Sequence, residues 1–362
     1  VNGTVSNINI AGTGKVSGGL AETMGPGAVI DHCVITSGTT LSGENIGGIV
    51  GSIDQSGSNV YTIKNCAVED GATIKGTGNM VGGIVGSVIG DSSGSAIIEN
   101  CTVGDVDITG KGKTDLSGNP SDGGTGSGIG GLGGILGYGS AQISGCSGDA
   151  NLSVTGSKGY GIGGIVGTAG ETQGGVTIEK SSFTGSIYVE EGNSIGGILG
   201  ARMGMDNFPA DLNDVYCTAD ITVNKGTAGG ILGNNYNNGT VKIENAYWNG
   251  TAHTTPDSEV YAIANGNGSK IDVTNAYYST NGDALYGDSF GTEKEASAFV
   301  SGELAYELDK NHNPRGTWTQ GENGPEFGSG PEDAIYKVEV EKTETVTWPD
   351  GTTAEVTTTV SS

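Results

Sequence analysis

One motif recurs along this 362-residue chain: two glycines, two aliphatic residues and a further glycine. Its copies are NIGGIVGSI at 45–53, VGGIVGSV at 81–88, LGGILGYG at 132–139, IGGIVGTA at 162–169, IGGILGAR at 195–202 and AGGILGNN at 228–235, with a looser SGGLAETM at 17–24. The second glycines of successive doublets are 29, 35, 51, 30, 33 and 33 residues apart. A catalytic or phosphate-binding loop is needed once or twice, so a motif written seven times predicts a structural building unit.

A second recurrent element follows each doublet and reads TIKNCAV at 62–68, IIENCTV at 97–103 and KIENAYW at 242–248. A third, such as ATIKG or VDITG, closes the unit. These elements are short, β-branched and bounded by Gly, Asn or Ser, which is typical of strands. A unit of about 30–35 residues cannot bury its own apolar side, whereas stacked units can. We therefore predict an all-β fold over 1–285, a parallel β-solenoid (β-helix) of Gly-rich repeats, with stacked antiparallel hairpins as the alternative.

Glycine and asparagine have predictable places in such a coil. Glycine reaches positive φ at a tight corner, and it also lets a neighbouring layer approach closely. Asparagine tolerates left-handed conformations, and its amide can bond to the next Asn in a stack. We therefore predict that a column of corner residues contains Asn65, Asn100, Asn245 and Asn275, with His32 in the same column.

The cysteines follow the same column. We place all five directly after the corner: Cys33, Cys66, Cys101, Cys146 and Cys217. Ser181, Ala246 and Ala276 take this position in other repeats, so the position requires a small residue. Buried Cys behaves as a small hydrophobe, and no metal-type CxxC pair occurs, so we predict stacked free thiols. A disulfide between adjacent rungs and a reactive thiol are the alternatives.

The chain changes character after the repeats. We interpret 286–330 as a helix-plus-loop module that caps the solenoid, because TEKEASAFVSGELAYELDKN at 292–311 reads as a helix. Thr292 and Glu295 would form its capping box, and Phe299, Leu304 and Leu308 its apolar stripe. Residues 331–362 alternate with period 2 around a PDGT turn at 349–352. This predicts a β-hairpin or the start of a truncated following domain.

Composition excludes several kinds of partner. Sixteen Lys and Arg face 41 Asp and Glu, for a formal net charge of −25. Nucleic acids require a basic stripe, which this chain lacks, so we expect no nucleic-acid partner. No apolar run approaches the ~18 residues of a membrane span, so we expect no direct membrane insertion. Three scattered histidines match no metal spacing, and we predict neither a metal nor a cofactor.

The candidate binding residues are aromatic and lie late in the chain. The set is Tyr216, Tyr247, Trp248, Tyr277 and Tyr278. Stacked on adjacent rungs, such side chains would form a ridge that can stack on sugar faces or on a protein partner. The alternative is that they widen the core toward its C-terminal end. Acidic pairs such as Glu69 and Asp70 are interpreted as a solvated face, so no catalytic residue is predicted.

The doublet GGIVG, followed by I-x-N-C, resembles the GLUG repeat of bacterial surface proteins over roughly residues 15–285. NAYWNGT at 245–251 and NAYYSTNGD at 275–283 look like its closing variant. The resemblance implies a non-enzymatic, extracellular segment on a bacterial cell surface, a rigid scaffold for adhesion or ligand presentation. Its partners would be host glycans or extracellular proteins, and its anchor would lie in parts of the parent chain outside this sequence. The alternative is a carbohydrate-active β-helix enzyme, a polysaccharide lyase or glycoside hydrolase.

Overall fold

The computed structural model describes residues 3–5, 9–11, 15–55, 57–90, 94–111, 131–169, 175–203, 209–235, 239–266, 270–283, 285–287, 290–336, 339–347 and 353–361. The chain divides into two compact units, Val1–Glu293 and Lys294–Ser362. The capping role predicted for 286–330 stays a prediction, and the PDGT turn lies outside the described residues.

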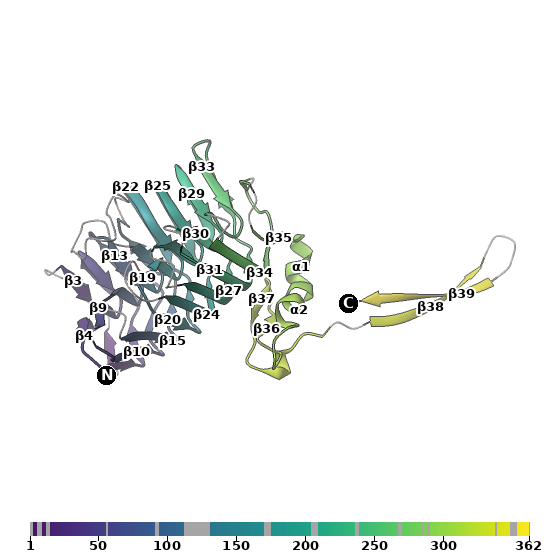
Figure 1. Ribbon diagram of the computed structural model, residues 1–362, viewed down its shortest axis with the longest axis horizontal. Coiled ribbons are helices and arrows are strands. Elements are labelled where there is room, and N and C mark those ends of the chain that lie inside the picture. Colours follow the sequence, from purple (N-terminus) through teal and green to yellow (C-terminus); the bar gives the residue numbers. More distant parts are fainter. Residues whose placement is uncertain are drawn as a thin grey trace. The chain divides into compact units, whose positions relative to one another are not determined.

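The first unit is a parallel β-solenoid of about seven turns built from three sheets (Figure 1). Sheet A comprises β1 (Gly3–Val5), β5 (Val29–Asp31), β6 (Cys33–Ile35), β10 (Val60–Lys64), β11 (Ala67–Val68), β15 (Ser95–Glu99), β16 (Thr102–Val103), β20 (Gln142–Ser144), β21 (Ser147–Gly148), β24 (Val176–Phe183), β27 (Ala210–Cys217), β31 (Val241–Trp248), β34 (Ile271–Tyr278) and β35 (Thr292–Glu293).

Sheet B comprises β2 (Asn9–Ala11), β3 (Val16–Gly18), β7 (Thr40–Gly43), β8 (Asn45–Gly47), β12 (Thr73–Gly76), β13 (Met80–Gly82), β17 (Asp107–Thr109), β18 (Gly131–Gly133), β22 (Asn151–Gly163), β25 (Ser186–Gly196), β28 (Asp220–Val223), β29 (Gly226–Gly229), β32 (Ala252–His253) and β33 (Ser258–Tyr261). Sheet C comprises β4 (Ala21–Met24), β9 (Val50–Gln55), β14 (Val85–Gly90), β19 (Leu136–Gly139), β23 (Val166–Ala169), β26 (Leu199–Arg202) and β30 (Leu232–Asn235). Strands in these sheets pair in parallel with the equivalent strands one turn away, so the predicted solenoid is confirmed and the antiparallel alternative is wrong.

Sheet C lies between the other two sheets, which makes the cross-section three layers thick. Figure 1 shows β9, β19 and β30 between strands of sheet B above and strands of sheet A below. On the sheet B side, a Cβ on Gly86 would lie 2.9 Å from the backbone of Ile46. On the sheet A side, the Tyr61 hydroxyl donates to the Asp54 carbonyl at 2.8 Å. Strand β23 is buried along its whole length because both of its faces are covered.

The glycine doublets stand where the chain passes from sheet B into sheet C. None of them has positive φ, so the prediction that they take tight corners in a left-handed conformation is wrong. The close-approach prediction is confirmed. For each pair of stacked second glycines from Gly19–Gly48 to Gly197–Gly230, a Cβ on the earlier one would lie 1.9–2.3 Å from the carbonyl oxygen of the later one. Backbone contact between rungs therefore requires glycine at this position.

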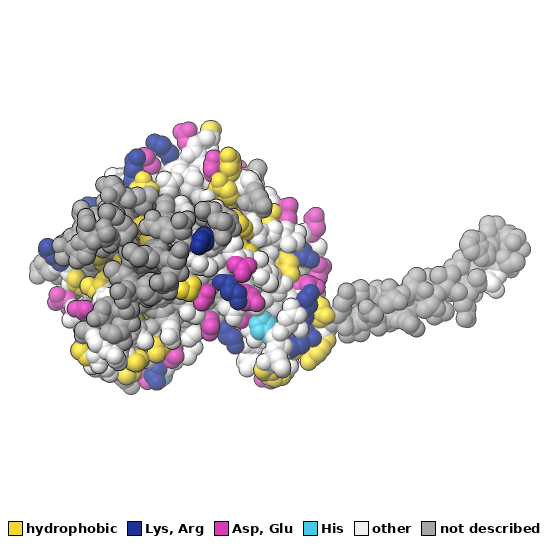
Figure 2. All heavy atoms as spheres, viewed as in Figure 1, with side chains coloured by type: hydrophobic (Ala, Val, Ile, Leu, Met, Phe, Trp, Pro, Cys, Tyr) yellow, Lys and Arg dark blue, Asp and Glu magenta, His cyan; other side chains and the backbone are white. Residues whose placement is uncertain are grey.

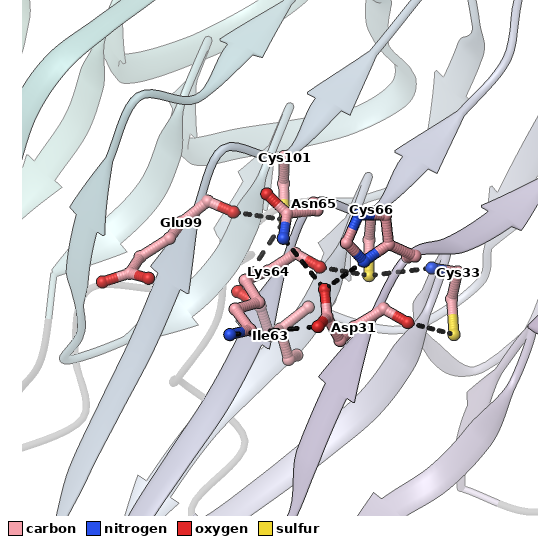
Figure 3. A network of polar contacts seen from close by, with 9 residues as sticks. Asp31, Cys33, Ile63, Lys64, Asn65, Cys66, Glu99 and Cys101 are labelled. Carbon is pink, nitrogen blue, oxygen red and sulfur yellow. Dashed lines mark hydrogen bonds and ion pairs between the residues drawn. The ribbon is translucent and has the colours of Figure 1, made fainter. Parts of the chain in front are cut away.

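The corner column is confirmed on every rung from 32 to 275. Its members share a left-handed conformation, with φ of 52° at His32, 53° at Asn65, 50° at Asn100, 62° at Gly145, 44° at Lys180, 51° at Asp214, 52° at Asn245 and 59° at Asn275. Asn275 Nδ2 donates to Asn245 Oδ1 at 2.8 Å, as predicted for stacked asparagines. Asn65 Nδ2 donates instead to Asp31 Oδ1 at 2.9 Å (Figure 3).

Asp31 is the charged centre of the corner network in Figure 3. His32 Nδ1 lies 2.6 Å from Asp31 Oδ1, and Lys64 Nζ lies 3.9 Å from Asp31 Oδ2. The hydrogen bond from Asn65, with the nearby His32 and Lys64, holds the pKa of Asp31 below its usual range. The network joins two rungs at the exposed corner and leaves the Asp31 carboxylate ionised at neutral pH.

Four of the five cysteines occupy the predicted position directly after the corner. The Cys33 amide donates to Cys66 Sγ at 3.4 Å, and Cys66 Sγ donates to the Lys64 carbonyl at 3.2 Å (Figure 3). The place assigned to Cys217 is wrong. The corner of that rung is Asp214, so Val215 fills the position, and Cys217 is in register with Phe183 and Trp248.

The second unit contains α1 (Ala296–Val300), α2 (Glu303–Asp309), the pair β36 (Trp318–Gln320) and β37 (Pro325–Phe327), the 3-10 helix η3 (Pro331–Asp333) and the hairpin of β38 (Glu339–Thr347) and β39 (Thr353–Ser361). The predicted single helix is wrong because Gly302, with φ of 86°, separates α1 from α2. The capping box is also wrong, since Thr292 belongs to β35. The predicted apolar stripe is buried, and the antiparallel hairpin is confirmed.

A buried carboxylate organises this unit. Asp309 is fully buried at the end of α2, and its oxygens accept hydrogen bonds from the backbone amides of Gly316, Thr317 and Trp318. Arg315 Nε lies 3.2 Å from Asp309 Oδ2. A buried charge requires this kind of pairing, so Asp309 fixes the loop between α2 and β36.

Candidate functional site

One column of sheet A faces outward, and it changes from small residues to tyrosines along the solenoid axis. Its members are in register on successive turns: Ala67, Thr102, Ser147, Ser182, Tyr216, Tyr247 and Tyr277. Side chains alternate between the two faces of a strand, so residues on either side of this column point into the core. Val215 and Cys217, which flank Tyr216, are both fully buried.

A groove of about 700 Å³ follows the small-residue part of this column. Ala67, Thr102, Ser147 and Ser182 form its floor, and Tyr216 lines the end where the tyrosines begin. The groove exists because four successive rungs carry small side chains while the next rung carries a ring. It runs along the axis, across the strands.

Three carboxylates line the groove, and each connects two rungs. Glu69 Oε2 accepts a hydrogen bond from the Ser37 amide at 3.2 Å. Asp70 Oδ1 accepts one from the Asp105 amide at 2.9 Å. Asp149 Oδ1 accepts one from the Thr184 hydroxyl at 3.0 Å. These acidic side chains therefore hold neighbouring turns together while they add negative charge to the groove.

The sign of charge in the groove differs from that of the wider surface. Figure 2 shows Asp and Glu interspersed with Lys and Arg over the described part of the face in view. The described residues that line the groove include Glu69, Asp70 and Asp149 but no Lys, Arg or His. An anionic ligand would meet only like charge there.

Tyr216 and Tyr247 are stacked, with ring centroids 5.0 Å apart and planes 3° from parallel. Tyr247 belongs to the following turn, so the other face of the Tyr216 ring is directed toward the preceding turn, where its register partner is Ser182. Tyr216 is half-buried, whereas Tyr247 and Tyr277 are 2% and 8% exposed. Of the three, Tyr216 therefore offers the most ring surface to a ligand.

The structure separates the other two predicted binding residues from this column. Trp248 and Tyr278 are each one position further along their strands, and that offset turns a side chain to the opposite face of a sheet. Trp248 is fully buried in the core, so its place in the binding set is wrong and the core-widening alternative holds for it. Tyr278 is partly buried and packs against the same core. The sequence does carry a signal for this difference. Side chains alternate between the two faces of a strand, so counting positions from the corner residue assigns each aromatic side chain to one face.

The cysteines show no sign of reactivity. All five are free and buried, so the disulfide alternative is wrong. A hydrogen bond with Cys146, together with burial, raises the pKa of Cys101 to about 12. Burial raises the pKa of Cys217 to about 12. Neutral thiols of this kind are poor nucleophiles and poor metal ligands.

Among the described residues, no three His, Cys, Asp or Glu side chains come together in an arrangement that could hold a metal ion. None of the described helices is long and apolar enough to cross a membrane.

Comparison with known proteins adds little beyond these observations. No family model matches the chain, and no curated protein matches it. The chain is similar to a solved structure, the crystal structure of a "putative immunoglobulin A1 protease" from Bacteroides ovatus. The sequence identity is 17%, the TM-score is 0.48, and the match covers 81% of this chain and 91% of that one.

Proposed function

We propose that this chain is a non-enzymatic segment of a bacterial cell-surface protein and that its solenoid is a rigid scaffold for adhesion or ligand presentation. The observation that carries the proposal is the outward column of sheet A, in which an open groove ends at the stacked rings of Tyr216 and Tyr247. A groove that combines hydroxyls, carboxylates and an aromatic ring is suited to recognition. The GLUG-like pattern of the repeats supports the cell-surface location.

Rigidity follows from the way the turns are joined. Parallel hydrogen bonding continues from rung to rung through all three sheets, and it extends through the glycine turns, where the Gly48 amide donates to the Gly82 carbonyl at 3.1 Å. In a solenoid each repeat contacts only its neighbours, so each added turn lengthens the scaffold. Host glycans or extracellular proteins are the partners we propose, with the anchor elsewhere in the parent chain.

A carbohydrate-active enzyme is the second candidate, because Glu69, Asp70 and Asp149 line one groove. Glycosidic cleavage needs a pair of carboxyl groups that donate and accept protons at the scissile bond. Here each carboxylate accepts a hydrogen bond that connects two rungs, so a catalytic proton transfer would compete with a structural contact. This observation favours binding over hydrolysis.

The test is a screen of the full chain over a printed array of glycans and matrix proteins, read for both protein retention and loss of printed ligand. Retention without loss on a small set of spots is the expected result and would identify the partner class. Loss of a printed glycan would replace the binding proposal with the enzymatic one. No retention on any spot would contradict adhesion by this segment.

A further inference from the structure

We infer that the groove of sheet A binds an uncharged polysaccharide chain laid along the solenoid axis, with one sugar ring against the face of Tyr216. The inference deepens the proposed function and rests on it. Three features of the groove carry it: its direction, the chemistry of its lining and the ring at its end.

The direction of the groove favours a chain molecule that crosses the strands. Thr102, Ser147 and Ser182 come from three successive rungs, which are spaced about 4.8 Å apart. A ligand that runs along the axis therefore meets a similar small, hydroxyl-bearing side chain at each step. A repeating ligand such as a polysaccharide can match a repeating floor.

An extended peptide is less well suited to this surface. Peptides that bind sheets do so by adding a strand to an open edge, where backbone groups are unpaired. Strands β16 and β21 are paired with neighbours on both sides, so the groove floor has no free strand edge. Recognition there must use side chains, which favours a ligand rich in its own hydroxyl groups.

The lining of the groove also discriminates between uncharged and acidic ligands. Carboxylates and hydroxyls both accept hydrogen bonds from sugar hydroxyls, and the Thr and Ser hydroxyls can also donate. Glu69, Asp70 and Asp149 would repel uronate or sulfate groups, and none of the described lining residues is basic. The groove therefore discriminates against acidic polysaccharides through like-charge repulsion.

Tyr216 supplies the apolar contact. Its ring is stacked on that of Tyr247, and Tyr216 lines the groove together with the small, largely buried side chain of Ser182 on the preceding turn. The ring is fixed before a ligand arrives, so binding does not have to order it. A sugar ring would place its apolar face on Tyr216, while the rest of the chain forms hydrogen bonds with the floor of the groove.

The experiment measures binding of the full chain by isothermal titration calorimetry to a panel of soluble hexasaccharides. Cellohexaose, laminarihexaose and mannohexaose are the neutral probes, hexagalacturonate is the acidic probe, and a Lys-Ser hexapeptide is the peptide probe. We expect at least one neutral hexasaccharide to bind and hexagalacturonate to bind at least about tenfold more weakly, if at all.

Two variants with matched controls locate the site. Ser147→Arg fills the floor of the groove, and Ser153→Arg adds the same side chain to sheet B on the same turn, outside the groove lining. Tyr216→Ala removes the ring, and Tyr188→Ala removes an exposed tyrosine of sheet B. We expect a loss of more than tenfold for Ser147→Arg, roughly three- to tenfold for Tyr216→Ala, and less than twofold for the controls. Thermal unfolding of each variant verifies that it is folded.

The outcomes separate this inference from the proposed function. Neutral-sugar binding that both groove variants weaken supports both. Retention on the printed array that neither groove variant alters overturns the groove inference but leaves the scaffold proposal standing. Binding only of hexagalacturonate or of the peptide likewise overturns the inference. No binding to the soluble panel and no retention on the array would overturn both.

Discussion

Two stacks of residues run the length of the same solenoid, and they differ in how strictly they restrict the sequence. At the glycine doublets, every turn from Gly48 to Gly230 keeps glycine in the second position. At the corners, the stack contains His, Asn, Gly, Lys and Asp, although every one of them is left-handed. The position with the unusual conformation is thus the more permissive of the two.

The difference shows that steric contact is a harder constraint than an unfavourable φ. A left-handed L-residue costs roughly 1–2 kcal/mol, which the rest of a rung can offset. A Cβ placed about 2 Å from the carbonyl oxygen of the next rung cannot be accommodated unless the two rungs separate.

Gly83→Ala should cause the largest loss. Its Cβ would lie 1.9 Å from the Gly134 carbonyl oxygen, so sheets and rungs must move apart. We expect the free energy of unfolding to fall by at least about 3 kcal/mol, measured by urea denaturation.

Gly25→Ala is the matched control, because a Cβ there has no atom within 4 Å and Gly25 is not left-handed. Its effect should stay within about 0.5 kcal/mol. Equal effects for the two variants would show that close backbone contact between rungs is not what restricts the doublets.

Cys217→Ser should have the next largest effect. Cys217 is fully buried, in register with Phe183 and Trp248, and its Sγ accepts a hydrogen bond from the Ala219 amide at 3.4 Å. A serine there would bring a hydroxyl donor into otherwise apolar packing. We expect a loss of about 1–3 kcal/mol in the free energy of unfolding.

Cys101→Ser provides the contrast within the corner-following column. Ser181 already fills that position on another rung and donates to the Glu179 carbonyl at 2.8 Å. The substitution should cost less than about 1 kcal/mol. A larger loss at Cys101 than at Cys217 would contradict the placement of the two thiols.

Alkaline pH should destabilise the solenoid because the buried thiol of Cys217 stays protonated in the folded state. The pKa of Cys217 rises from 9.0 to about 12 on burial, so the folded state keeps a proton that the unfolded state releases. Below pH 9 the thiol is protonated in both states, so its contribution to the stability of the folded state is fully present. Between pH 9 and 12 only the unfolded state loses the proton, so this contribution is lost as the pH rises. By pH 10 the loss should be about 1 kcal/mol.

The measurement is the free energy of unfolding at pH 8 and pH 10 for the natural chain and for Cys217→Ala. The variant should lose less stability between the two pH values, since it lacks one buried acid. Identical changes in the two proteins would contradict a pKa of Cys217 that is higher in the folded state than in the unfolded state.

Lys180→Asn should produce the smallest effect, and in the opposite direction. Lys180 is an exposed corner residue with φ of 44°, and Asn tolerates that conformation better than Lys does. We expect a gain of about 0.5–1 kcal/mol in the free energy of unfolding. Lys75→Asn, on an exposed strand position, is the control and should give no gain. A loss at Lys180 would mean that its side chain contributes more than its backbone costs.

Much of the fold follows from sequence because stacked repeats reveal their own register. The spacing of the doublets predicts the turns, and the Asn column predicts the corners at Asn65, Asn100, Asn245 and Asn275. The prediction failed where one rung departs from the column. Asp214 replaces the corner Asn, so alignment on the nearby cysteine placed Cys217 two positions away from its true role.

The candidate site was only half predictable for a related reason. The clustering of aromatic residues after 215 indicated a ridge, and Tyr216, Tyr247 and Tyr277 do form one column. The groove beside them depends on Ala67, Thr102, Ser147 and Ser182, which are ordinary small residues far apart in sequence. Small side chains do not indicate a groove in the sequence, because only the strand register brings them together beside the ring of Tyr216.

The sequence predicted a repeating coil, its column of corner residues and its column of small buried residues, because each depends on local conformation and on a period that the chain repeats. Only the tertiary structure shows that sheet C lies between two others (Figure 1) and that the doublet glycines serve backbone contact between rungs. It also shows that Trp248 packs in the core, whereas Tyr247 lies on the opposite face of the sheet and stacks on Tyr216. These features depend on which surfaces meet across the coil. Contacts between layers are set by packing distance and strand parity, and neither is written in any single repeat.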